Sequence, residues 1–336
     1  MRRTREFSQG AVHRLSHNSA VLEGNPLGDP ATRELHVYTP AGWTAHEKLP
    51  LLVDLPGFGG SGMGHTNWRP IGENVPERLD RLIGSGAMGR AVVAFPDCFT
   101  RVGGNQYINS AGTGRYEDYL IGEIVPFVEK QFGCGGTGRR ACFGKSSGGY
   151  GAIWHGMHHA DFWAAVSCNS GDMGFDTLQL PDFYKSLVVL AKHGMSVQKF
   201  WEYFEASPKP SIEERHCRMF LAMGAHFDPD PGSFLFIRLP GDPHTAELIP
   251  ERWSNWLKYD PARLASECAG QLRKLKGLWM DCGDHDQFRI HFGMRRLDRE
   301  LKRLGVEHVY EEFADDHTDV DYRMDKFLPF LVRRLS

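Results

Sequence analysis

Short apolar segments that alternate with helical patterns constrain the fold of this chain most. Three of them, at residues 51–53, 91–95 and 164–166, are apolar at every position. Such continuous runs are typical of strands that are covered on both faces, as in a parallel sheet flanked by helices. The alternation therefore predicts an α/β fold with a mostly parallel central sheet.

The positions of the individual elements follow from the same patterns. We expect strands at residues 34–38, 51–55, 91–95, 140–144, 164–167, 278–281 and 307–313. Segments 115–130 and 289–304 carry apolar residues on one helical face and are predicted helices. Gly305 directly follows the second of these and is suited to a left-handed helix cap.

Residues 176–262 interrupt this alternation. Pro181 predicts the start of a helix, and Ser211 with Glu214 forms a capping box that opens another. The segment lies between two predicted sheet strands and is rich in aromatic residues. We therefore predict an α/β core domain at residues 1–175 and 263–336, with an inserted helical cap at 176–262.

Composition excludes several classes of protein. The 39 basic and 42 acidic residues give a net charge of −3, so we do not expect nucleic acid as a partner. No apolar run approaches the roughly 20 residues of a membrane helix. The seven cysteines are scattered without a C-x-x-C pair, which indicates a reduced, cytoplasmic protein. We expect a monomer or a homodimer.

The motif Gly144-Lys-Ser146-Ser-Gly148 carries the strongest chemical signal. It follows a predicted strand and precedes a helical stretch that starts at Gly149. In this strand–turn–helix context, G-x-S-x-G forms a nucleophile elbow, whose tight turn requires small flanking residues. Ser146 is the predicted nucleophile, and Ser147 would contribute only its backbone N–H.

A nucleophilic serine needs a base, and the base needs an acid that orients it. In folds with such a nucleophile elbow, the three catalytic residues follow one another along the chain in the order serine, acid, histidine. His317 lies in the loop after the last predicted strand and is the predicted base. Asp286 is the first candidate for the acid and Asp284 the second, whereas Asp281 would still lie on its strand.

The glycine-rich segment 56–62 follows an early strand, where this fold supplies an oxyanion donor. Gly57 allows close approach of the backbone, and we assign the oxyanion hole to the N–H groups of Phe58 and Ser147. The segment also matches the dinucleotide pattern G-x-G-x-x-G. That alternative is weak, because Gly64 lies where a helix should begin and Pro70 follows downstream, so we expect no helix N-terminus placed to hold a pyrophosphate. We expect no metal and no cofactor.

With these motifs in place, the chain resembles the putative-esterase branch of the α/β-hydrolase superfamily. That branch includes esterase D (S-formylglutathione hydrolase) and the enterochelin and feruloyl esterases. Segments 34–42, 56–60, 107–110, 116–118, 144–152, 170–172, 286–288 and 316–317 carry the resemblance. It implies that Gly57, Tyr107 and Asn109 belong to the substrate site. The chain lacks the Thr-Cys pair of the esterase D oxyanion loop and has a longer cap, so we expect a substrate of its own.

The predicted function is that of a serine carboxylesterase working through an acyl-enzyme. Acyl transfer by the same triad is the alternative, and a non-catalytic binding protein is a weaker one. Four cap aromatics, Phe183, Trp201, Phe204 and Phe234, are predicted to line the pocket and to favour apolar over small charged esters. The competing interpretation is that they form the cap's own core.

Overall fold

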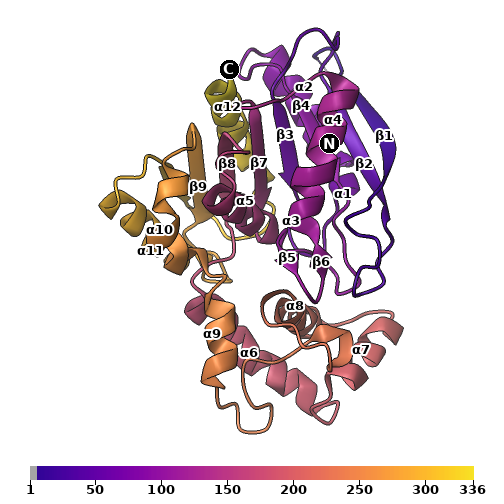
Figure 1. The fold of residues 1–336 in the computed structure, drawn as a ribbon, viewed down its shortest axis with the longest axis vertical. Helices are drawn as coiled ribbons and strands as arrows, with labels where there is room; N and C mark the ends of the chain where they lie inside the picture. Colours follow the sequence, from indigo (N-terminus) through magenta and orange to yellow (C-terminus); the bar gives the residue numbers. More distant parts are fainter. Residues whose placement is uncertain (1–5) are drawn as a thin grey trace.

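The computed structural model describes residues 6–336, which form one eight-stranded sheet with helices on both faces (Figure 1). The strand order is β1-β2-β4-β3-β7-β8-β9-β10. Their bounds are β1 Ala11–Asn18, β2 Thr32–Thr39, β3 Leu51–Leu55, β4 Val92–Pro96, β7 Arg140–Lys145, β8 Ala165–Asn169, β9 Gly277–Gly283 and β10 Val309–Phe313. β1, β2 and β4 pair antiparallel and all other neighbours parallel, which confirms the predicted sheet.

The helices divide into two layers around the sheet and a separate group. Their bounds are α1 Gly62–Thr66, α2 Val75–Gly84, α3 Tyr116–Asp118, α4 Val125–Phe132, α5 Ser147–His158, α6 Phe175–Ala191, α7 Val197–Ala206, α8 Ile212–Phe227, α9 Pro250–Leu257, α10 Pro261–Leu272, α11 Ile290–Arg303 and α12 Met324–Leu335. α4, α5, α10 and α11 cover one face, and α2 and α12 cover the other. On β3, Leu51 and Val53 point to the first layer and Leu52 to the second, so the strand is buried on both sides.

The first strand, β1, was not predicted. It lies at the edge of the sheet, pairs only with β2, and alternates exposed and half-buried residues. An edge strand that faces water on one side has no continuous apolar run, so the signal used for the central strands is missing.

The predicted helix at 115–130 is interrupted in the structure. A short strand β6 (Gly114–Arg115), which pairs with β5 (Asn109–Ser110), precedes α3. A π-helical stretch, Tyr119–Ile124, then separates α3 from α4. Pro126 follows at the start of α4, where it lacks the N–H that would continue an α-helical ladder.

The prediction that Pro181 begins a helix is wrong. α6 begins at Phe175 and runs through Pro181. A proline inside a helix leaves the carbonyl four residues earlier without its usual donor. Here that carbonyl, Thr177 O, accepts a hydrogen bond from Nε of Arg289 at 2.8 Å. A distant side chain thus satisfies the group that the proline leaves unpaired.

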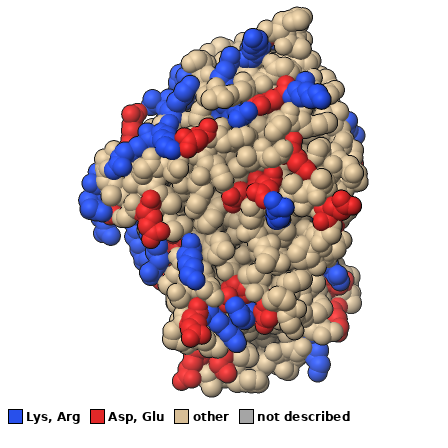
Figure 2. All heavy atoms as spheres, viewed as in Figure 1, with Lys and Arg blue, Asp and Glu red and all other residues tan. Residues whose placement is uncertain are grey.

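Helices α6 to α9 form a group connected to the sheet through β8 and α10 (Figure 1). Their apolar core also includes Val102, Ile108 and Tyr150 of the sheet domain. The capping box of Ser211 and Glu214 is present at the start of α8, as predicted. Below we call α6–α9 and their loops the cap. In Figure 2, acidic and basic side chains are interspersed on the visible face. Among the helices of residues 6–336, none combines the length and apolarity that crossing a membrane requires.

Candidate active site

Ser146 lies at the tight turn between β7 and α5. Its φ of 58° is in the left-handed region, which a residue with a side chain adopts only under strain. Both flanking glycines are required by the neighbouring strand β3. A Cβ on Gly144 or on Gly148 would overlap the carbonyl oxygen of Leu55. The adjacent strand therefore dictates the glycines of the motif and fixes the serine in the turn.

We expect Gly148→Ala to lower the free energy of unfolding by about 1–3 kcal/mol, because the added methyl group has no space. Gly270→Ala is the matched control, since that position in α10 has no atom within 4 Å of an added Cβ. There the substitution should stabilise by about 0.5–1 kcal/mol. Urea denaturation measures both. Equal effects of the two substitutions would contradict this account of the elbow.

His317 and Asp286 form a buried pair. The distance from Nδ1 of His317 to Oδ2 of Asp286 is 2.7 Å, and the two residues are 8% and 2% exposed. The other oxygen, Oδ1, accepts the backbone N–H groups of Phe288 at 2.8 Å and Ile290 at 3.4 Å. Burial raises the pKa of Asp286, but the hydrogen bond and charge of His317 outweigh it and hold that pKa below its usual value. The carboxyl group is therefore ionised and oriented toward the imidazole.

The other two acids near this loop do not contact His317. Asp284 pairs with His285 at the surface. Asp281 lies on β9, as expected, and accepts a hydrogen bond from Nε of Arg323 at 3.0 Å. Burial raises the pKa of Asp281 to about 6. Of the three aspartates, only Asp286 is positioned to orient the imidazole.

Two side chains hold the backbone of His317. Nζ of Lys145 donates to the carbonyl of His317 at 2.8 Å, and Oε1 of Gln287 accepts its N–H at 2.9 Å. Burial lowers the pKa of Lys145. Lys145 is the residue between the glycine and the serine of the G-x-S-x-G motif. Its bond to His317 therefore connects the turn at Ser146 to the loop that carries the histidine. Sequence reasoning assigned it no role, because nothing local indicates so distant a partner.

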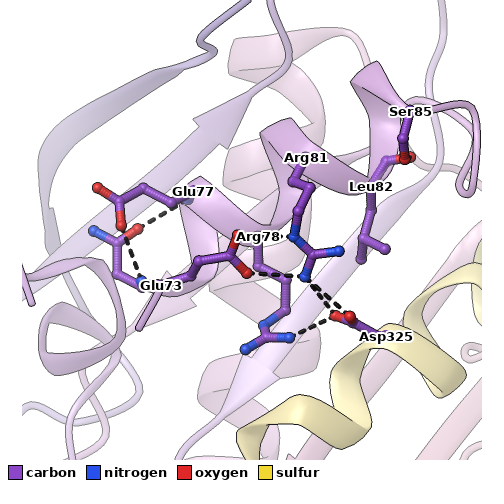
Figure 3. Close-up of polar contacts among 8 residues, drawn as sticks. Glu73, Glu77, Arg78, Arg81, Leu82, Ser85 and Asp325 are labelled. Carbon is purple, nitrogen blue, oxygen red and sulfur yellow. Dashed lines mark hydrogen bonds and ion pairs between the residues drawn. The ribbon is translucent and has the colours of Figure 1, made fainter. Parts of the chain in front are cut away.

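The segment after His317 is anchored by ion pairs. Asp321 binds Arg69 at 2.8 Å. At the start of α12, Asp325 lies between Arg78 and Arg81 of α2, and Arg81 also binds Glu73 (Figure 3). The segment that follows His317 is thereby tied to α2 and to the loop before it.

A cavity of about 650 Å³ lies between the carboxyl ends of the strands and the cap. Ser146 and His317 both line it. So do Gly57 and Phe58 of the glycine-rich loop. A Cβ on Gly57 would lie 3.4 Å from Cβ of Ser146, so the loop backbone passes directly beside the serine. Ser147 is the first residue of α5, where backbone N–H groups have no partner within the helix.

A polar group that the sequence did not indicate lies behind the turn. Oγ of Ser147 accepts a hydrogen bond from Nε2 of Gln106 at 2.6 Å and donates to Oδ2 of Asp172 at 3.3 Å. Asp172 and Ser146 also line a small void of about 20 Å³. Burial raises the pKa of Asp172 to about 6, so this carboxyl group titrates near neutral pH.

The raised pKa predicts a pH-dependent effect of Asp172→Asn. The folded protein holds the Asp172 proton more tightly than the unfolded chain, with a pKa of about 6 against 3.8. The corresponding stability is present below the unfolded pKa and is lost as pH rises through 6, by up to about 3 kcal/mol. At pH 8 the neutral amide should therefore stabilise the protein by about 1–3 kcal/mol, and at pH 4 it should have little effect.

Denaturation at the two pH values measures this difference. The exposed Asp161 is the control, and Asp161→Asn should change stability by less than about 0.5 kcal/mol at either pH. A destabilising effect of Asp172→Asn at pH 8 would contradict the assignment.

A second histidine–aspartate pair faces the same cavity. Nδ1 of His65 lies 2.7 Å from Oδ2 of Asp54, which is 1% exposed. Burial lowers the pKa of His65, but the charge of Asp54 outweighs it and the net shift is upward. The available signal was a charged residue inside the apolar strand β3.

Five residues predicted for the substrate site lie outside the cavity. Tyr107 is buried, and its hydroxyl donates to Pro56 O at 2.5 Å. Asn109 binds Asp118. Phe183, Trp201 and Phe234 pack in the cap core, which supports the competing interpretation made from the sequence. Of the four predicted cap aromatics, only Phe204 lines the cavity, because the helices turn the others inward.

A parallel sheet with a serine at a strained strand–helix turn is the architecture of the α/β-hydrolase esterases. The family described as "Putative esterase" matches residues 30–325, and the chain belongs to this family. It is a serine hydrolase of carboxylic ester bonds.

Solved structures show the same fold. A ferulic acid esterase is 22% identical with a TM-score of 0.62, and the match covers 97% of this chain and 99% of that one. S-formylglutathione hydrolase from Staphylococcus aureus is 15% identical with a TM-score of 0.58, covering 97% and 100%. The Agrobacterium tumefaciens S-formylglutathione hydrolase is 16% identical with a TM-score of 0.58, covering 97% and 96%. No curated protein matches the chain.

Proposed function

We propose that the protein hydrolyses small carboxylic esters through a triad of Ser146, His317 and Asp286. The observation that carries this proposal is the 2.7 Å bond between His317 and Asp286 at a cavity that Ser146 also lines. In the first step, Oγ of Ser146 attacks the ester carbonyl and its proton passes to Nε2 of His317. The proton then goes to the leaving alcohol, and an acyl-serine remains.

Water completes the cycle by the same route. It gives a proton to His317 and attacks the acyl-serine, and the proton returns to Oγ of Ser146 as the acid leaves. Asp286 stays ionised throughout, fixes the tautomer of the imidazole and stabilises the imidazolium. The lowered pKa of Asp286 supports this role.

The oxyanion formed in each step needs donors beside the serine. We assign the backbone N–H groups of Phe58 and Ser147, with Gly57 allowing the loop to approach. The position of the loop beside Ser146 and the start of α5 at Ser147 support this assignment. Each such donor contributes about 3 kcal/mol to transition-state stabilisation.

Two further parts of the proposal concern the cap and the cellular location. We place the cap at residues 176–262 and the α/β core domain at residues 1–175 and 263–336. From the cap, Phe204 contacts the substrate. Its place at the cavity wall supports this contact. We place the protein in the cytoplasm, a location that its seven buried, unpaired cysteines support.

A labelling and product assay tests the function. A fluorophosphonate probe should modify the wild type on Ser146, as located by mass spectrometry of peptides. With 4-nitrophenyl acetate, the free acid should be the product in water. If added methanol or a sugar captured most of the acyl group at millimolar concentration, acyl transfer would replace hydrolysis. Absence of both labelling and ester turnover would refute the proposal.

A further inference from the structure

The wall that the cap presents to the cavity is basic. Arg215, Arg218 and Met219 lie at i, i+3 and i+4 on α8, hence on one side of that helix, and all three line the cavity with Ser146 and His317. The sequence had predicted an apolar roof that disfavours charged esters. Because most cap aromatics turn inward, arginines take the positions that face the cavity.

Arg218 has no polar partner. Within residues 6–336, its guanidinium forms no hydrogen bond and no ion pair. It lies over the rings of Phe204 at 5.1 Å and Trp201 at 5.8 Å. Burial lowers its pKa, although the charge of Glu205 acts in the opposite direction. Glu205 is itself exposed and accepts the indole N–H of Trp201 at 3.0 Å.

The opposite wall leaves space for this guanidinium. Gly103 is buried, has a φ of +100°, and a Cβ added there would overlap Nη2 of Arg218. A side chain at position 103 would therefore displace the guanidinium group of Arg218. The ring stacking and the glycine together fix the location of the Arg218 guanidinium.

The acidic groups of the cavity are already occupied. Asp54 binds His65, Asp281 binds Arg323, and Asp321 binds Arg69. These pairs lie on the sheet side of the cavity, and in each of them the carboxylate already has a basic partner. The guanidinium of Arg218 on the cap side has no carboxylate within ion-pair distance in residues 6–336, and partial burial of such a charge is costly unless a ligand pairs with it.

We propose that Arg218, assisted by the exposed Arg215, binds a negatively charged carboxylate or phosphate group on the ester substrate. This inference rests on the proposed function and adds the substrate class, an anionic ester whose carbonyl lies at Ser146. The planar fork of a guanidinium matches two oxygens of such a group, and a half-buried site strengthens these hydrogen bonds.

Matched ester pairs test the proposal on either side of the scissile bond. On the acyl side, 4-nitrophenyl hemiglutarate is compared with 4-nitrophenyl pentanoate. On the alcohol side, 4-acetoxybenzoate and 4-acetoxyphenyl phosphate are each compared with the neutral 4-acetoxybenzamide. For at least one pair, the wild type should favour the anionic ester in kcat/KM. The pair that responds identifies the side and the kind of anion.

Variants then assign the preference to the arginine. Arg218→Met should lower the anionic-to-neutral ratio of kcat/KM about 10- to 100-fold, the effect of losing a charge-assisted hydrogen bond. Arg218→Lys, which keeps the charge without the fork, should lose less. Lys199→Met removes an exposed cation of α7 away from the cavity and should leave the ratio unchanged.

The outcomes separate this inference from the proposed function. Equal kcat/KM for every wild-type pair would overturn the anionic subsite while ester hydrolysis stands. The anionic subsite would also be overturned if Arg218→Met lowered thermal stability and lowered kcat/KM equally for anionic and neutral esters. The arginine would then serve only the packing of the cap. Loss of fluorophosphonate labelling in the wild type would instead refute the triad. The wild-type comparison decides even if Arg218→Met does not fold.

Discussion

Ser146→Ala is expected to lower kcat for ester hydrolysis by about 10⁴-fold or more, and to abolish fluorophosphonate labelling. The reason is that the acyl-enzyme route requires this oxygen, while water attacking directly gains only from the oxyanion donors that remain. The substitution removes one atom from a half-buried side chain and leaves both flanking glycines in place. Steady-state kinetics with 4-nitrophenyl acetate measures the loss.

The neighbouring serine provides the control. Ser147→Ala keeps the backbone N–H and removes only the hydroxyl that contacts Gln106 and Asp172. This variant should still be labelled and lose no more than about tenfold in kcat. A label on Ser147, or full activity in Ser146→Ala, would show that the nucleophile is assigned to the wrong residue.

His317→Ala should lose nearly as much kcat as Ser146→Ala, because the two side chains act as one unit. Asp286→Asn should lose up to about 10⁴-fold, since the amide can favour the wrong imidazole tautomer. Asp284→Asn should change kcat by less than about threefold, because the side chain of Asp284 pairs with the exposed His285 and not with His317. The same steady-state assay measures all three.

The ranking of the two aspartates decides the acid. A larger loss in Asp284→Asn than in Asp286→Asn would transfer the role to Asp284 and contradict the 2.7 Å bond to His317 as the working contact. Circular dichroism shows whether any variant has lost its fold.

The sheet and the turn at Ser146 could be predicted from the sequence because their signals are local. Continuous apolar runs identify strands buried on both faces, and the glycines around Ser146 reflect the carbonyl of Leu55 on the next strand. The choice between Asp284 and Asp286 could not be made in this way. Two acids two residues apart in one loop differ only in how the loop turns, and the N–H groups of Phe288 and Ile290 determine that turn.

The cap was harder to predict for a related reason. Aromatic residues such as Trp201 and Phe183 suit either a packed core or a pocket wall, and composition does not distinguish them. The decisive quantity is the rotation of each helix about its axis, which depends on contacts between helices distant in sequence. Nothing in the local sequence indicated that Arg218 is unpaired either, because this depends on which side chains the fold brings close to it.

The bond from Arg289 to the carbonyl that Pro181 leaves open has a mechanical consequence. Arg289 lies three residues after Asp286, so the first turns of α6 are fastened to the loop that carries Asp286. Any swing of the cap about the start of α6 would pull on that loop and disturb the pair with His317. The start of α6 and the loop that carries Asp286 are therefore mechanically coupled, and a displacement of one is transmitted to the other.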